Sequence, residues 1–155
     1  MRTDDPRLEK AHQEMTERVR KFNELMLVVM KNHITMEQFL NDVLSAAGRP
    51  WKRRPCSGKI DIAKTLHLVE IDQRIWAVIE AGNKLRNQIA HTYDQTKLAA
   101  KMSELRKAYL AAITPEQAKH SEGLDDPRIA AGAFELCGAD LVVASESVRD
   151  GQKRG

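Results

Sequence analysis

The chain has 155 residues, of which 42% are hydrophobic, 30% are charged and only 5% are aromatic. This length suits one cooperative domain and is too short for two ordinary ones, and the composition favours helices over a sheet. The formal net charge of +3 permits contact with nucleic acid without requiring it.

The two cysteines, Cys56 and Cys137, are far apart and have no neighbouring ligand pattern. They predict neither a disulfide framework nor a zinc motif, so we expect a reduced cytoplasmic protein that needs no metal or cofactor. The N-terminal residues lead into a charged segment and lack the apolar stretch of a signal peptide. The longest apolar run, residues 25–30, is far shorter than the roughly 20 residues that cross a bilayer, so we expect no membrane insertion.

A long amphipathic helix is predicted from Asp5-Pro6, an acidic cap followed by a proline in the first turn. Near residues 31–35 the apolar pattern falters before it resumes and runs to Gly48. The helix either bends there or restarts with Thr35 as its cap. The apolar positions are Leu8, Ala11, Met15, Val19, Phe22, Met26 and Val29, then Met36, Phe39, Leu40, Val43, Leu44 and Ala47.

Residues 49–57 contain two prolines, four cations and one tryptophan, which predicts an exposed loop. This loop is either a solvated connector or a nucleic-acid-binding element. In the second interpretation Lys52, Arg53 and Arg54 contact phosphates and Trp51 offers a stacking face. A short helix over residues 59–69 is expected to follow.

A second long helix is predicted from Ile71, with apolar or small residues alternating in steps of four and three. Gly82 lies within this seam, which indicates close approach of another helix because glycine otherwise weakens a helix interior. The alternative is a break at Gly82, with Asn83 capping a new helix.

A further helix is predicted over residues 96–113, with Thr114-Pro115 as its end. Residues 114–126 are polar and turn-rich, and Asp126-Pro127 repeats the pattern of a cap followed by proline. We therefore expect one all-α domain, 1–149, built as a bundle of about five helices. Its core covers about 7–113, an extra C-terminal helix covers about 127–149, and residues 150–155 form a disordered tail.

The chemistry of the chain is concentrated in residues 86–93, which read RNQIAHTY. Arg86 carries a planar fork of donors that suits phosphate, and His91 can exchange a proton near neutral pH. Asn87 and Tyr93 add a carboxamide and a phenol within about two helical turns. These groups could support acid–base cleavage of RNA without a metal.

This string resembles the signature of the HEPN superfamily, and Tyr93 matches the extended Arg-x4-His-x-Tyr form of its toxin branch. Residues 57–66 are similar to the segment that precedes the signature in mannitol-repressor-like relatives. The resemblance implies an HEPN-like helical bundle that dimerises near the motif and acts on RNA. It also implies an antitoxin or nucleotidyltransferase partner, with Tyr93 as a target for modification.

On an ideal helix Arg86 and His91 are separated by about 140°, so they do not share a face. A second subunit or a neighbouring helix must complete the site. Asn87 shares the face of His91 and would orient it. The alternative is a buried polar group in which Arg86 pairs with an acidic residue such as Glu37 or Glu80 and His91 caps a carbonyl.

The leading hypothesis is a metal-independent endoribonuclease of HEPN type in defence or as a toxin, with Arg86 and His91 catalytic and Asn87 and Tyr93 supporting. The alternative is a non-catalytic regulatory or interaction protein of mannitol-repressor-like type, and a third hypothesis is a nucleotide-binding accessory subunit. The other histidines have no ligand-spaced partners and are expected on the surface or as satisfied helix residues: His12, His33, His67 and His120.

Overall fold

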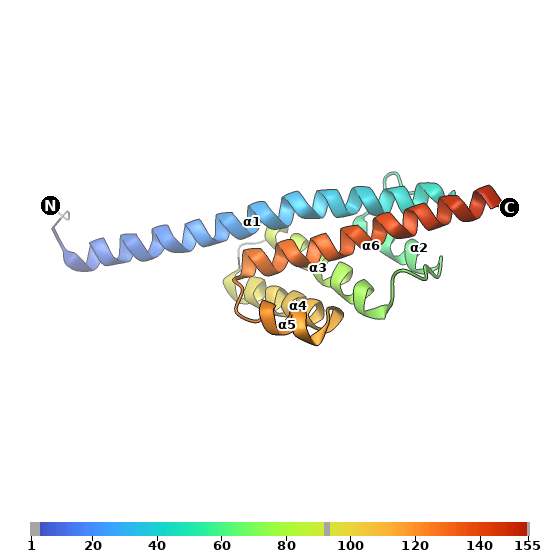
Figure 1. The fold of residues 1–155 in the computed structure, drawn as a ribbon. Helices are drawn as coiled ribbons and strands as arrows, with labels where there is room; N and C mark the ends of the chain where they lie inside the picture. Colours follow the sequence, from blue (N-terminus) through green and yellow to red (C-terminus); the bar gives the residue numbers. More distant parts are fainter. Residues whose placement is uncertain (1–3, 92–93, 155) are drawn as a thin grey trace.

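The computed structural model describes residues 4–91 and 94–154, and within these it is all-helical. Six helices follow one another along the described chain (Figure 1). The all-α bundle is confirmed, although the number of helices is six rather than about five. The helices are α1 (Pro6–Ala46), α2 (Cys56–Lys64), α3 (Gln73–His91), α4 (Gln95–Ala112), α5 (Pro115–Ser121) and α6 (Asp126–Arg154).

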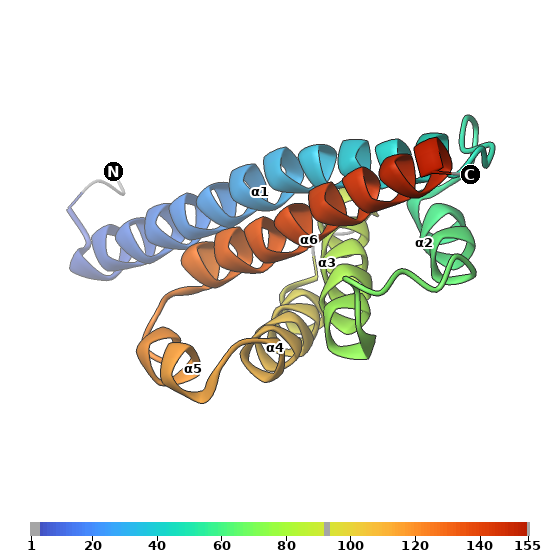
Figure 2. The same cartoon turned by 45° about the vertical axis from the view of Figure 1, so that its right-hand side comes forward.

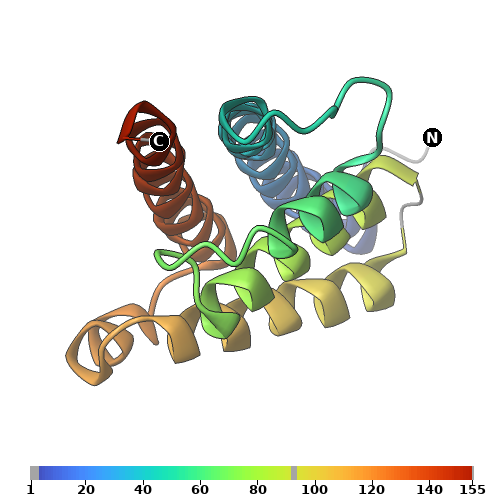
Figure 3. The ribbon, with the colours of Figure 1, turned by 90° about the vertical axis from the view of Figure 1, so that its right-hand side faces the viewer.

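The bundle has two layers. Helices α1 and α6 lie side by side and run in the same direction, as the two views in Figures 1 and 2 agree, and they share the largest contact between any two helices. Figure 3 shows these two helices nearly end-on, with α3 and α4 running across them in the second layer. Helix α2 packs against α1 and α3.

Helix α6 belongs to the core and is not an addition to a bundle that ends near residue 113. Its inner face is buried among the residues of α1, α3 and α4. The helix also continues past residue 149, the end expected from the sequence, to Arg154. The core-facing residues of α6 are Ile129, Ala130, Ala133, Phe134, Cys137, Leu141 and Ala144.

Helix α1 is uninterrupted through residues 31–35, so the predicted restart at Thr35 is wrong. Asp5 caps its start, since the carboxylate accepts a hydrogen bond from Arg7 N at 2.9 Å. The apolar pattern falters because His33 occupies a core position, where it is only 2% exposed. Asn32 and Thr35 turn back onto carbonyls of the preceding turn and leave the helix intact.

Helix α3 is likewise continuous through Gly82, so the predicted break is wrong and the predicted close approach is confirmed. A Cβ atom at Gly82 would lie 2.9 Å from Cε1 of Phe134 on α6. Asn83 is buried inside the helix and does not cap one. The absence of a side chain at Gly82 lets α6 lie close to α3.

Two shorter elements differ from the expected boundaries. Helix α2 begins at Cys56 and ends at Lys64, earlier at both ends than the predicted 59–69. Helix α5 lies where the sequence predicts only a polar, turn-rich segment after a helix that ends at Thr114-Pro115. Thr114 and Gln117 form a reciprocal capping box, in which each side chain accepts a hydrogen bond from the other residue's backbone N–H, at 3.2 and 3.1 Å.

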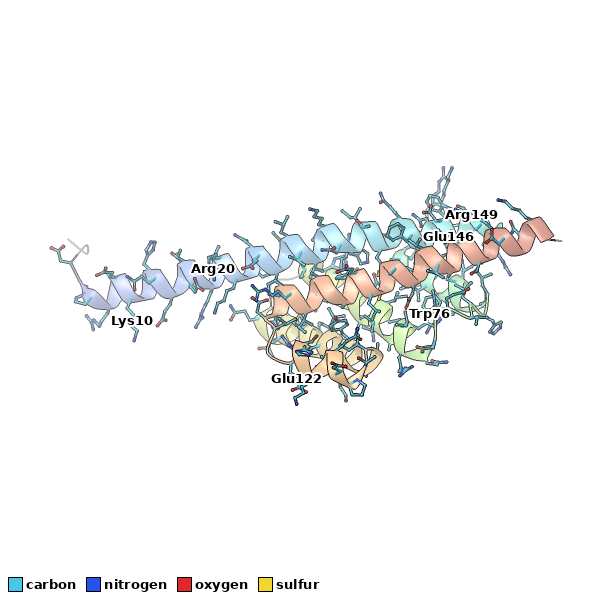
Figure 4. The ribbon with its side chains drawn as sticks, in the orientation of Figure 1. Lys10, Arg20, Trp76, Glu122, Glu146 and Arg149 are labelled. Atoms are coloured by element: carbon cyan, nitrogen blue, oxygen red, sulfur yellow. The ribbon has the colours of Figure 1, made fainter. Side chains whose placement is uncertain are left out.

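The N-terminal part of α1 projects beyond the rest of the bundle (Figure 1). Every residue from 6 to 21 is exposed, and we call this segment the arm. The side chains of Lys10 and Arg20 extend from it in Figure 4. In the described residues no helix is long and apolar enough to cross a membrane.

Candidate functional site

The motif predicted from the sequence occupies the last turns of α3, where Arg86 and His91 have different environments. Arg86 and Asn87 are half-buried, and Arg86 Nη1 donates a hydrogen bond to Asn87 Oδ1 at 3.3 Å. His91 is the last residue of α3 and is exposed. The structure therefore pairs Asn87 with Arg86, whereas the sequence assigned it to His91. Tyr93 lies outside the described residues.

A polar cluster that the sequence did not predict lies where α1, α2 and α3 meet. In α1, His33 and Glu37 are one helical turn apart. His33 Nε2 is 3.1 Å from Asn83 Oδ1 on α3, and His33 Nδ1 is 3.9 Å from Glu37 Oε2, beyond hydrogen-bonding distance. From α2, the buried ammonium of Lys59 donates to Glu37 Oε1 at 2.8 Å. The cluster thus joins three helices through polar contacts.

The charge of Arg86 reaches this cluster. Burial lowers the pKa of His33, and the hydrogen bond to Asn83 and the charge of Glu37 oppose this effect only in part, while Arg86 lowers the pKa further. Burial raises the pKa of the Cys56 thiol to about 12, and Arg86 acts against this rise. At neutral pH the cluster therefore holds a neutral imidazole and a protonated thiol beside two cations and a carboxylate.

His33, Glu37 and Cys56 could each offer one ligand atom to a metal, and these atoms lie within 4.8 Å of one another. The carboxylate, however, already has a cation, because Lys59 forms its ion pair with it. To bind a metal the thiol of Cys56 would have to be deprotonated, which its raised pKa opposes. The cluster is thus satisfied as an ion-paired junction of three helices.

The acidic residues expected to pair with Arg86 pair with lysines. Glu37 binds Lys59, and Glu80 binds Lys64 on α2. Arg86 instead has its hydrogen bond with Asn87. The buried polar group proposed as the alternative is therefore not formed with the partners named for it, and His91 is exposed rather than buried.

The basic loop joins the end of α1 to the start of α2 (Figure 1). Lys52, Arg53 and Arg54 are exposed, as the nucleic-acid-binding interpretation requires. Trp51 is half-buried, donates from Nε1 to Ser45 Oγ at 2.7 Å, and has the ammonium of Lys59 over its ring at 5.2 Å from the centroid. One face of the ring is therefore already used within the protein.

One signal in the sequence pointed to the cluster. His33 replaces an apolar residue in the core stripe of α1, between Val29 and Met36, and Glu37 follows it at helical spacing. This pattern indicates a buried polar group that needs a partner. The partner Asn83 is 50 residues away along the chain and could not be identified from periodicity.

No family model matches this chain, and it has no match among curated proteins or solved structures. The chemistry of the site is therefore inferred from its own residues.

Proposed function

We propose that the chain is an HEPN-type endoribonuclease that cleaves RNA without a metal and acts in the cytoplasm, in defence or as a toxin. The observation that supports this most directly is the end of α3. Arg86 is half-buried and held by Asn87, while His91 is exposed on the same short segment. A held guanidinium suits phosphate binding, and an exposed imidazole can reach a substrate proton.

In the proposed reaction His91 takes the proton of a ribose 2′-OH, and the 2′ oxygen attacks the adjacent phosphorus. The bond to the 5′ oxygen breaks, this oxygen receives a proton, and a 2′,3′-cyclic phosphate remains. Arg86 stabilises the negative charge that develops on the phosphoryl oxygens. Asn87 positions Arg86, and Tyr93 is proposed to position the RNA backbone or to be modified by an antitoxin.

A single copy supplies only part of this site, because Arg86 and His91 are about 140° apart around α3. We therefore propose that the active form is a homodimer whose interface lies near this segment, so that the second copy completes the site. The exposed cations of the loop, Lys52, Arg53 and Arg54, would then bind further phosphates of the RNA.

The test is incubation of the purified protein with labelled RNA in the presence of EDTA. Wild type should cleave, and Arg86→Ala and His91→Ala should each lose at least about 100-fold in rate. His120→Ala, which removes an exposed histidine from α5, is the matched control and should cleave like wild type. The products should carry cyclic phosphate ends, and a 2′-deoxyribose at the cut site should block the reaction.

The second candidate is a non-catalytic regulatory or interaction protein of mannitol-repressor-like type. The projecting arm favours it, since an exposed helical segment with apolar residues suits binding to a partner such as an antitoxin or a nucleotidyltransferase. The hydrogen bond between Arg86 and Asn87 would then serve packing. Absence of cleavage at protein excess, or a His91→Ala variant that cleaves like wild type, would favour this candidate over the enzyme.

A further inference from the structure

The arm carries an apolar stripe whose residues from Leu8 to Val19 are exposed in the part of the chain that the structure describes. Leu8, Met15 and Val19 are 46%, 57% and 50% exposed, and Ala11 is exposed beside them. Phe22, half-buried, continues the same face just beyond the arm. Scattered apolar residues are common on surfaces, but these five lie within an arc of about 80° on the helix. The stripe is thus a continuous helix face.

The spacing of the stripe is symmetric. From Leu8 to Phe22 its residues follow in steps of 3, 4, 4 and 3, so the order is the same from either end with Met15 at the centre. Two copies laid antiparallel with Met15 against Met15 would place Leu8 at the level of Phe22 and Ala11 at the level of Val19. Apolar residues would then lie beside apolar residues over a length of about 21 Å.

We propose that the arm is a dimerisation element, in which the α1 arms of two copies pack antiparallel about a two-fold axis at Met15. The proposal rests on the homodimer of the proposed function and specifies its surface, whereas its test needs no RNA. An isologous contact of this kind requires one self-complementary face, which the symmetric stripe provides.

The charges on the arm fit this arrangement. Glu14 and Arg18 lie on the same flank of the stripe, and in the antiparallel pair each Glu14 comes within about 3 Å, along the axis, of Arg18 in the second copy. Neither is in an ion pair among the described residues, whereas Arg20 on the outer side is bound by Glu17 and Glu24 of its own helix. Two equivalent ion pairs can therefore form across the interface.

The antiparallel arrangement also brings two like charges near each other. Arg7 would lie near Lys21 of the second copy on the same flank. Each already has an acidic neighbour in its own chain, since Arg7 is 2.9 Å from Asp5 and Lys21 is 3.9 Å from Glu17. Their repulsion is therefore reduced.

The surface around Phe22 provides room for the end of the second arm. A pocket of about 530 Å³ opens there, with Phe22, Leu98 and Met102 among its lining, and Leu8 of the second copy would reach this level. A neighbouring hollow is lined by Met15, Val19 and Gln95. Because Gln95 begins α4 only four residues after His91, the last residue of α3, the arm of the second copy would lie beside the end of the motif.

The first experiment measures mass by light scattering and affinity by sedimentation equilibrium on the full chain. Wild type should dimerise at micromolar concentration, and Met15→Asp should raise the dimer Kd at least tenfold, or about 1.4 kcal/mol, because two carboxylates would face each other. Leu27→Asp is the matched control, since Leu27 is 67% exposed and lies about 120° away from Met15 around α1. A monomeric wild type, or equal effects of the two variants, would overturn the proposal.

The second experiment tests the register by charge exchange. Arg18→Glu and Glu14→Arg should each weaken the dimer, because like charges would then face each other. The double variant, Glu14→Arg with Arg18→Glu, should recover most of the lost affinity. A double variant that dimerises no better than the single ones would overturn the antiparallel arrangement. RNA cleavage is assayed separately, so a confirmed dimer without cleavage would count against the enzyme alone.

Discussion

Replacing Gly82 with alanine is expected to destabilise the fold, although alanine is the better helix former. In an open helix interior the change would stabilise by about 1 kcal/mol. At Gly82, however, the new Cβ would lie 2.9 Å from Cε1 and 3.1 Å from Cζ of Phe134. Such overpacking costs about 1–3 kcal/mol when the neighbour cannot move freely.

Phe134 has little freedom to move. It is only 4% exposed, and its ring meets the buried ring of His33 edge to face, with 6.2 Å between the centroids and an angle of 82°. Displacing it would disturb the contact with His33 as well as the packing of α6 on α3. We therefore expect the clash to outweigh the gain in helix propensity, with a net loss of about 1 kcal/mol in the free energy of unfolding.

Urea unfolding followed by the fluorescence of the two tryptophans measures this change, and a melting curve should show a decrease of about 3 °C in Tm. Gly138→Ala in α6 is the matched control. Its Cβ would meet Phe39 at 3.4 Å, at the limit of ordinary contact, so alanine should stabilise by about 0.5 kcal/mol. If Gly82→Ala also stabilised the protein, the inferred close packing of α3 on α6 would be wrong.

Three further predictions concern the rest of the fold. Lys59→Met should destabilise by about 2 kcal/mol in urea unfolding, because it leaves the partly buried carboxylate of Glu37 without its cation, and adding Glu37→Gln should recover part of the loss. Cys137 is 1% exposed and its pKa is raised by burial, so it should react with a thiol reagent only as fast as the protein unfolds. Rapid labelling of Cys137 in native buffer would contradict its buried position. Thr114→Ala should lower the free energy of unfolding by about 1 kcal/mol by removing the cap of α5, whereas Thr96→Ala, at an exposed position of α4, should not destabilise.

Features determined by neighbours in the sequence could be predicted. The start of α1 at Asp5-Pro6 follows from local capping chemistry, and the long helices follow from their apolar periodicity. The start of α6 was predicted to within one residue, since Asp125 and not Asp126 accepts the capping hydrogen bond, from Arg128 N at 3.1 Å. The position of Gly82 in its seam indicated a close helix contact, which Phe134 provides. Local pattern and tertiary packing agree at these places.

Features determined by tertiary contacts could not be predicted. The apolar pattern of α1 is interrupted at His33, which suggested a helix end. The helix continues because Asn83 on α3 provides a partner for this buried histidine, and that partner cannot be seen from the local sequence. The same contact explains why Asn83, a good cap by propensity, lies inside a helix. For the candidate site, the sequence located Arg86 and Asn87 but not the cluster of His33, Glu37 and Lys59 beside them, whose members come from two other helices.

The pairing of α1 with α6 has a consequence for the order in which the chain can fold. These are the first and the last of the described helices, yet they form the largest helix contact in the bundle. During synthesis the apolar face of α1 therefore stays exposed until residues 126–154 have been made. Because the main interface closes a loop of most of the chain, the loop-closure entropy is lost before the core forms. Folding should thus be late and cooperative, and a nascent chain stalled before α6 should present α1 to chaperones as an exposed apolar helix.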